Sequence, residues 1–227
     1  MKVFTKSWYA EMQVRGFLVF PETEQDWEED VAGYTAKGLD FEKMRKEELE
    51  FRKADLLRFL PESFHPYIHD GTIISVFPSR ELREMSERWK CDYNDRMKII
   101  SQNYRNGYDQ IKDTLPQNAT QLHEKSLHDA IVLSYESFSD DAFVLTLDCS
   151  GSYHYYTEVR LTFRGVTELA VPEGLVGAWW LYDEIYANEF GFELHVLLDM
   201  PLMELHIIAE DVLIEPQTLR TGEQNEA

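Results

Sequence analysis

The apolar positions in the first half of the chain recur at the spacing of α-helices. Every fourth residue from Phe4 to Met12 is apolar or aromatic, which predicts a short helix with one apolar side. Residues 41–60 carry the most regular pattern of this kind. Asp40 precedes them as the predicted N-cap, and Pro61 follows as the predicted end of the helix.

Capping residues predict two further helices. Thr23 precedes a segment with several acidic residues, which favour the first turn of a helix because of its dipole. Ser79 precedes a longer pattern that places Trp89, Tyr93 and Tyr104 on one side. The segment Leu-Pro-Gln-Asn-Ala-Thr at 115–120 then predicts a linker.

Beyond residue 120 the apolar positions alternate with a period of two, which is typical of β-strands. The predicted strands are residues 131–137, 142–148, 158–164, 180–186, 192–198 and 203–214. No helical pattern separates them, and this disfavours parallel pairing through crossover helices. The pattern therefore predicts an antiparallel sheet, sandwich or open barrel of about six strands.

These patterns together predict an α+β protein with two parts. Residues 1–118 form the expected helical region, and residues 126–216 form an antiparallel β domain. Residues 217–227 have almost no apolar side chains, so a disordered tail is expected there.

The charge changes at the same place as the pattern. Up to Leu127 the chain has 19 Lys and Arg against 23 Asp and Glu, a net charge of −4. From His128 onward only three arginines oppose 19 Asp and Glu, a net charge of −16. Such an acidic domain disfavours nucleic acid as a partner and attracts basic proteins or cations. Acidity that serves only solubility is the alternative.

The composition also bears on the compartment. No stretch reaches the ~18 apolar residues that a membrane span needs, and the first residues lack the apolar core of a secretory signal. Cys91 and Cys149 have no CxxC spacing, and two reduced thiols fit them better than a disulfide or a zinc site. We therefore expect a cytoplasmic protein that does not span a membrane.

Two aromatic clusters lie in the predicted β domain, at residues 153–156 and 179–182. Packing inside the sheet explains most such clusters, and a contact surface for a partner is the alternative. The candidate residues for partner binding are Trp179, Trp180, Tyr182, Asp183 and Glu184.

A short repeat, Glu-Leu-His, occurs at 193–195 and again at 204–206. Residues two apart on a strand share a face, so each glutamate stands beside its histidine. A hairpin turn between the repeats would set His195 opposite His206, with Glu204 opposite Leu197. His195, His206, Glu193 and Glu204 are therefore candidate metal ligands. Two histidines on a solvent-facing surface, or a register shifted by two residues at the proline of the turn, are the alternatives.

The other candidate sites have weaker support in the sequence than this repeat. His65 and His69 have the i, i+4 spacing of helical metal ligands, but Pro66 and Gly71 predict a loop instead. His128 and Asp129 fit a turn. No nucleotide-binding loop and no nucleophile motif is present, so the sequence indicates neither a cofactor nor a catalytic residue.

Three short segments resemble an uncharacterised bacterial family, DUF4085. They are Phe-Thr-Lys-Ser-Trp-Tyr at 4–9, Phe-Leu-Pro at 59–61 and Leu-His-Asp-Ala at 127–130. The resemblance extends over nearly the whole chain. It implies a bacterial cytosolic protein and no established activity, so it supplies no site residue.

The sequence favours a binding protein over an enzyme. The leading hypothesis is a protein of the bacterial cytosol that uses its acidic, aromatic β domain against a basic protein partner, with an immunity role as one form of it. The alternative is a metal-dependent hydrolase with the His/Glu site of the C-terminal hairpin.

Overall fold

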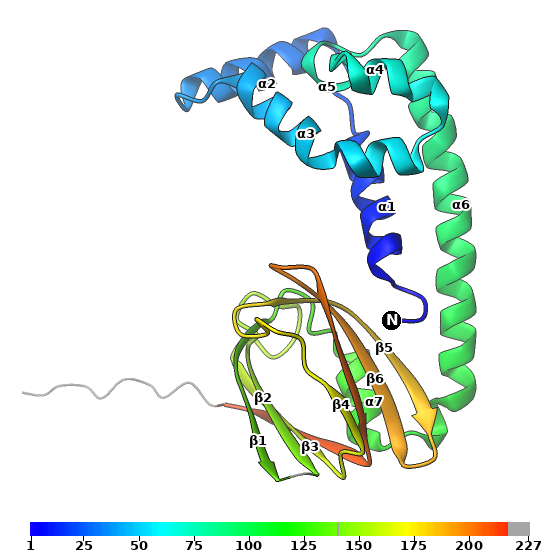
Figure 1. Cartoon of the computed structure of the whole chain (residues 1–227), viewed down its shortest axis with the longest axis vertical. Helices are drawn as coiled ribbons and strands as arrows, with labels where there is room; N and C mark the ends of the chain where they lie inside the picture. Colours follow the sequence, from blue (N-terminus) through cyan, green and yellow to red (C-terminus); the bar gives the residue numbers. More distant parts are fainter. Residues whose placement is uncertain (140, 218–227) are drawn as a thin grey trace, which may run out of the picture. The chain divides into compact units, whose positions relative to one another are not determined.

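A computed structural model of the chain describes residues 1–139 and 141–217. The chain forms two compact units (Figure 1). The helical unit is Ser7–Ser101, and the β unit combines Met1–Lys6 with Gln102–Ala227. The prediction of an α+β protein with a helical N-terminal part and an antiparallel sheet is confirmed. The predicted disordered tail lies outside the described residues, except for Gln217.

The helices fill the first half of the chain and end shortly before the strands begin. They are α1 (Lys6–Phe17), α2 (Glu24–Ala36), α3 (Phe41–Phe59), α4 (His65–His69), α5 (Thr72–Ser75), α6 (Arg80–Ile111) and α7 (Gln117–Glu124), with short 3₁₀ turns at Glu62–Phe64 and Lys112–Thr114. Within the described residues no helix is both long and apolar enough to cross a membrane.

The predicted N-caps are confirmed by side-chain hydrogen bonds. Thr23 forms a capping box with Asp26 at the start of α2. The Asp40 carboxylate accepts the backbone N–H of Lys43 at 3.1 Å, and the Ser79 hydroxyl accepts that of Leu82 at 3.2 Å. These helices were predictable because their starts depend on residues adjacent in sequence.

The helical unit has its own apolar core. Its buried side chains include Val14, Leu18, Leu49, Leu56, Phe64, Ile68, Leu82 and Trp89. The indole N–H of Trp89 donates to the Phe59 carbonyl at 3.1 Å, so the buried polar atom has a partner. The predicted loop at residues 65–69 is wrong, because Pro66 lies in the first turn of α4 and favours a helix there.

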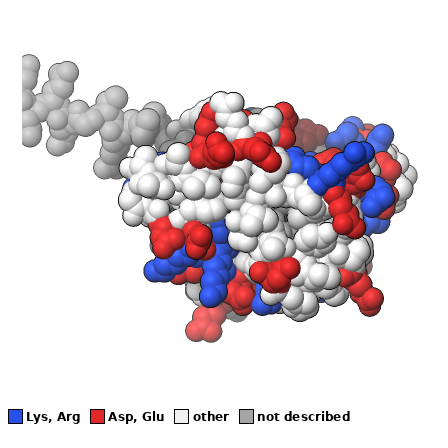
Figure 2. Space-filling model, turned by 90° about the horizontal axis from the view of Figure 1, so that it is seen from above, with Lys and Arg blue, Asp and Glu red and all other residues white. Residues whose placement is uncertain are grey.

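The polar surfaces of α3 and α6 carry charges of both signs. Arg80 and Glu84 of α6 form an i, i+4 ion pair of 2.7 Å, and Arg45 and Glu48 of α3 form an i, i+3 pair of 3.0 Å. Lys/Arg and Asp/Glu side chains also lie next to one another at several places on the face drawn in Figure 2. Exposed pairs of this kind contribute at most about 1 kcal/mol each.

The β unit is built on an antiparallel sheet whose eight described strands are ordered β4-β7-β6-β5-β1-β2-β3-β8. The strands are β1 (Ile131–Ser139), β2 (Ala142–Asp148), β3 (Glu158–Arg164), β4 (Glu168–Ala170), β5 (Trp179–Asn188), β6 (Gly191–Asp199), β7 (Met203–Ala209) and β8 (Asp211–Pro216). The number exceeds the predicted six because short β4 was not predicted and residues 203–214 form two strands.

The division of residues 203–214 occurs at Glu210. Strand β7 pairs with β6 and β4, whereas β8 pairs with β3 at the other end of the strand order. The Glu210 N–H donates to the Arg164 carbonyl at 3.0 Å, so the chain crosses from one part of the sheet to the other here. The buried positions are odd-numbered up to Ala209 and continue at even-numbered Val212, so the alternation changes phase at the crossing, although both strands enter the same core.

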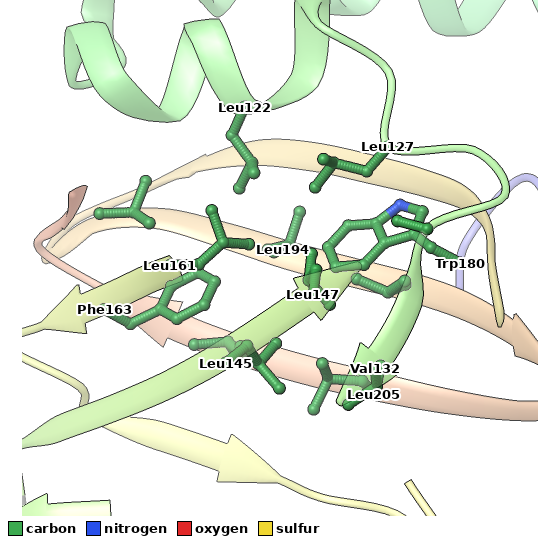
Figure 3. Close-up of a cluster of buried hydrophobic side chains, with 14 of the residues drawn as sticks. Leu122, Leu127, Val132, Leu145, Leu147, Leu161, Phe163, Trp180, Leu194 and Leu205 are labelled. Carbon is green, nitrogen blue, oxygen red and sulfur yellow. The ribbon is translucent and has the colours of Figure 1, made fainter. Parts of the chain in front are cut away.

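Both halves of the sheet supply that core (Figure 3). Leu145, Leu161 and Phe163 come from β2 and β3, and Leu194 and Leu205 come from β6 and β7. Leu122 and Leu127 point into the same cluster from α7 and the segment that follows it. The sheet is therefore curled, with its apolar side inward.

The predicted linker at 115–120 is wrong. Residues 117–124 form α7, and Ala119 and Leu122 are buried. Pro116 is the N-cap of that helix, and proline precedes helices as well as loops. The boundary between the units falls instead between residues 101 and 102, inside α6.

We predict that Leu122→Ala destabilises the β unit by about 2 to 5 kcal/mol, because it removes a buried side chain and leaves a cavity. Gln117→Ala, on the exposed start of the same helix, should change stability by less than ~0.5 kcal/mol. Urea unfolding monitored by tryptophan fluorescence measures both. Equal effects would show that α7 is not part of the core.

A second prediction concerns Gly191, which begins β6 with φ +133°. A Cβ there would lie 2.6 Å from the Glu210 carbonyl oxygen, so Gly191→Ala should destabilise the protein by at least ~2 kcal/mol. The matched control is Gly107→Ala on the exposed side of the C-terminal part of α6, where nothing lies within 4 Å. It should stabilise by about 0.5–1 kcal/mol, so the two substitutions differ in sign.

Candidate functional site

Polar side chains gather on the outer face of β5, β6 and β7. The register pairs Glu184 with His195 and His195 with His206, so one row crosses three strands. Their neighbours Ile185 and Leu194 point to the opposite side and are buried in the core. Glu193 and Glu204 lie on the same outer face, two residues from the histidines. These residues, Glu184, Glu193, His195, Glu204 and His206, are called the His–Glu cluster below.

The predicted hairpin register is confirmed. His195 lies opposite His206, and Glu204 lies opposite Leu197. The two imidazole rings stack with centroids 4.4 Å apart. Their side chains are only 12% and 20% exposed, so they do not lie on an open solvent face as the alternative expected.

Glu193 connects the two histidines. Its Oε1 atom lies 2.7 Å from His195 Nε2 and 3.2 Å from His206 Nε2. On the far side of its ring, His206 Nδ1 lies 3.3 Å from the carboxylate of Glu168 on β4. Each histidine therefore meets carboxylate oxygen at Nε2, and His206 meets it at both nitrogens.

The first residues of the chain lie on this cluster. The Glu184 carboxylate accepts the backbone N–H groups of Lys2 and Val3 at 2.8 and 2.9 Å, and also that of Phe4. The Tyr186 hydroxyl donates to the same carboxylate at 2.7 Å. Four donors thus compensate for the burial of this carboxylate, which is fully covered.

Lys2 and Met1 supply cationic contacts on the same face. The Lys2 ammonium lies 2.6 Å from Glu193 Oε2 and 4.0 Å from the centre of the Tyr186 ring. The Met1 amino nitrogen donates to Glu204 Oε2 at 2.9 Å and lies 3.3 Å from His195 Nδ1. The cluster therefore holds a positively charged segment that bends at residues 3 and 4.

The pKa values reflect these contacts. Burial by itself raises the pKa of Glu184, but the hydrogen bonds from Tyr186 and the backbone N–H groups bring it below its ordinary value. For Glu193, burial is again opposed, here by Lys2 and His195, and the pKa falls to about 2. Burial lowers the pKa of His195, which favours the neutral imidazole at pH 7.

Phe4 fixes the segment through aromatic contacts. Its ring lies 5.1 Å from that of Tyr104 and 6.2 Å from that of Tyr182. Helix α1 begins only at Lys6, so Phe4 is not part of it. The expected helical stripe from Phe4 to Met12 is corrected accordingly, because spacing cannot separate a helix from an anchor just before it.

A second polar network lies behind β5, and sequence reasoning missed it. His123 Nδ1 lies 2.5 Å from Asp183 Oδ1, and His123 Nε2 lies 3.3 Å from the Tyr104 hydroxyl. That hydroxyl accepts the Ile185 N–H at 2.9 Å, and Trp180 Nε1 donates to Asp183 at 3.1 Å. The network joins α6 and α7 to the strand. No local sequence motif predicts this network, because its residues are far apart in the sequence.

The five predicted partner-binding residues do not form one surface. Trp179 is 42% exposed, whereas Trp180 and Glu184 are fully buried, one in the core and the other beneath the N-terminal segment. Tyr182 and Asp183 are partly buried. Trp180 does not lie at an exposed surface, because its side chain faces the core. Glu184 is on the outer face, and residues 2–4 cover it there.

We predict that Glu184→Gln loosens the N-terminal segment, because an amide oxygen replaces a carboxylate that accepts three backbone N–H groups. Stability at pH 7 should fall by about 2 kcal/mol or more. Hydrogen exchange of residues 2–4, measured by mass spectrometry, should rise strongly. Glu189→Gln, on an exposed turn, is the control and should leave both measurements unchanged.

The same contacts predict acid sensitivity. The pKa values of Glu184 and Glu193 are lowered on folding, so their contribution is complete above the ordinary value of 4.5. It is lost as the pH falls from there toward about 2 for Glu193. Melting temperatures between pH 7 and pH 3 should fall less steeply in Glu193→Gln than in wild type. Parallel curves would contradict the assignment.

The family described as "Protein of unknown function (DUF4085)" matches residues 3–209, which include the whole His–Glu cluster and, from the N-terminal segment, Val3 and Phe4. The search among curated proteins found no match. The resemblance noted in the sequence thus extends over most of both units, and the chain belongs to the DUF4085 family.

Proposed function

We propose that the protein is a non-enzymatic binding protein whose β unit recognises a basic segment of a partner protein on the outer face of β5, β6 and β7. The observation that carries this proposal is the way the chain holds its own residues 1–4. Glu184 accepts the backbone N–H groups of residues 2–4, which bend around it, and Glu193 pairs with the Lys2 ammonium. The same chemistry suits another segment that offers backbone N–H groups and a cation.

The charge of the β unit supports a basic partner. From His128 onward, 19 acidic residues stand against three arginines. An excess of one sign steers oppositely charged partners and excludes nucleic acid, whose phosphates are repelled. Tyr186 adds an aromatic face for a cation.

We also infer the cellular compartment from the sequence. The protein acts in the bacterial cytoplasm, and an immunity protein that covers a basic toxin is one form that such binding takes. The two cysteines are unpaired, one exposed and one buried, and free thiols suit a reducing compartment.

The N-terminal segment competes with such a partner. It is tethered to the unit, so its effective concentration at the cluster is on the order of millimolar. A partner segment can displace it only if additional contacts compensate for this high effective concentration. The exposed side chain of Trp179 at the beginning of β5 offers one such contact.

The metal-dependent hydrolase remains an alternative prediction. Three of its four proposed ligands, Glu193, His195 and His206, come together. Glu204 instead pairs with the Met1 amino group. Hydrolysis needs a bound substrate and an activated water as well as a metal, so the binding function is favoured.

We predict that a fluorescent peptide with the sequence Met-Lys-Val-Phe-Thr-Lys binds the full chain in trans. Lys2→Glu should increase its affinity several-fold, because the tethered segment is then repelled by Glu193. Glu193→Gln should weaken binding, and Glu189→Gln should not. Anisotropy titrations at 0.01 M and 0.15 M salt measure this, since the Debye length shrinks from ~30 Å to about 8 Å.

The control peptide replaces both lysines by glutamates. Equal affinity for the two peptides, or affinity that does not change with salt, would remove the proposed recognition of a basic segment. In that case the acidity serves solubility.

A further inference from the structure

We propose that Glu193, His195 and His206 form a binding site for one divalent transition-metal ion of the zinc type. One ligand atom from each residue lies within 4.8 Å of the others, among the residues that the structure describes. Two imidazole nitrogens and one carboxylate oxygen are a donor set that zinc prefers, with water as the usual fourth ligand. The site shares Glu193 with the proposed peptide recognition but does not require that a peptide binds.

The sheet holds the three ligands in place before any ion binds. His195 and His206 are directly opposed on β6 and β7, and Glu193 is two residues from His195 on the same face. The hairpin behind them is anchored in the core by Leu194, Val196 and Leu205. Ligands on paired strands lose little conformational freedom on binding, which favours affinity.

The hydrogen-bond partners of His206 point to a cation. Its Nδ1 faces Glu168 Oε1 at 3.3 Å, and its Nε2 faces Glu193 Oε1 at 3.2 Å. A neutral imidazole carries one N–H, so it can donate to only one of these two carboxylates. With the proton on Nδ1, the Nε2 lone pair faces a carboxylate oxygen, and a metal ion between them turns that repulsion into two bonds.

The hydrogen bonds from the three ligand residues to their neighbours match those around known metal sites. Ligating histidines usually donate their second N–H to a carboxylate, as His206 would to Glu168. Glu193 would coordinate through Oε1, because Oε2 already accepts from Lys2 at 2.6 Å. Coordination through Nε2 would place the His195 proton on Nδ1, so the Met1 amino group, now 3.3 Å from Nδ1, would give up that contact and keep Glu204, 2.9 Å away. The other contacts of the segment over the cluster do not have to change.

The ligand chemistry also excludes hard cations. Mg²⁺ and Ca²⁺ prefer six or more oxygen ligands, whereas two of the three donors here are nitrogen. Zn²⁺ and Co²⁺ accept this set, and Co²⁺ reports its own coordination through visible absorption.

The test uses the full chain after dialysis against a chelator. Zn²⁺ is titrated by calorimetry, and Co²⁺ is followed by absorption between about 500 and 650 nm, where four-coordinate cobalt absorbs strongly. We expect one equivalent of either ion to saturate the wild-type protein, with no saturable binding of Mg²⁺. His206→Ala should abolish the cobalt bands, and Glu168→Gln should weaken affinity by roughly 10- to 100-fold.

Two matched controls separate the site from general acidity. His154→Ala removes an exposed histidine, and Glu189→Gln removes an exposed carboxylate, and both should bind like wild type. Circular dichroism verifies that each variant is folded, and the wild-type titration stands without any variant. Absence of saturable uptake by wild type, or equal uptake by folded His206→Ala, overturns the proposal. Failure of the peptide titration leaves this result unaffected.

Discussion

The carboxylate of Glu184 is buried, and among the described residues it is compensated by hydrogen bonds and not by an ion pair; the outer face of β5, β6 and β7 depends on this compensation. Its partners are the hydroxyl of Tyr186 and the backbone N–H groups of residues 2–4. The segment that covers the carboxylate thus supplies three of its donors, and a covered carboxylate without donors would cost several kcal/mol. The N-terminal segment is therefore part of the β unit, although the helical unit follows it in sequence.

The proposed binding of a basic segment and the proposed metal site use the same face of the sheet. The segment over Glu184 carries Lys2 to Glu193, and Glu193 is also the carboxylate shared by the two histidines. Its two oxygens serve different neighbours, one the ammonium and the other the imidazoles. Glu193 can therefore bind two kinds of cation at once, a lysine ammonium through one oxygen and a metal ion through the other.

The helical unit contributes none of these residues. Its core, around Leu56, Phe64 and Trp89, is separate from that of the β unit, and its capped helices form from local signals. Its 14 Lys and Arg stand against 20 Asp and Glu, a net charge of −6, and neighbouring residues of opposite sign pair along α3 and α6. Most of the excess acidity lies in the second half of the chain, where it bears on the choice of partner.

The sequence alone determined the helices capped by Thr23, Asp40 and Ser79, the antiparallel character of the sheet and the opposition of His195 and His206. In each case the deciding interactions lie within a turn or a hairpin. Only the tertiary structure decided that residues 117–124 cover the core as a helix and that residues 203–214 divide at Glu210. It alone also brought residues 1–4 to Glu184, because contacts between residues some 180 positions apart leave no periodic trace in the chain.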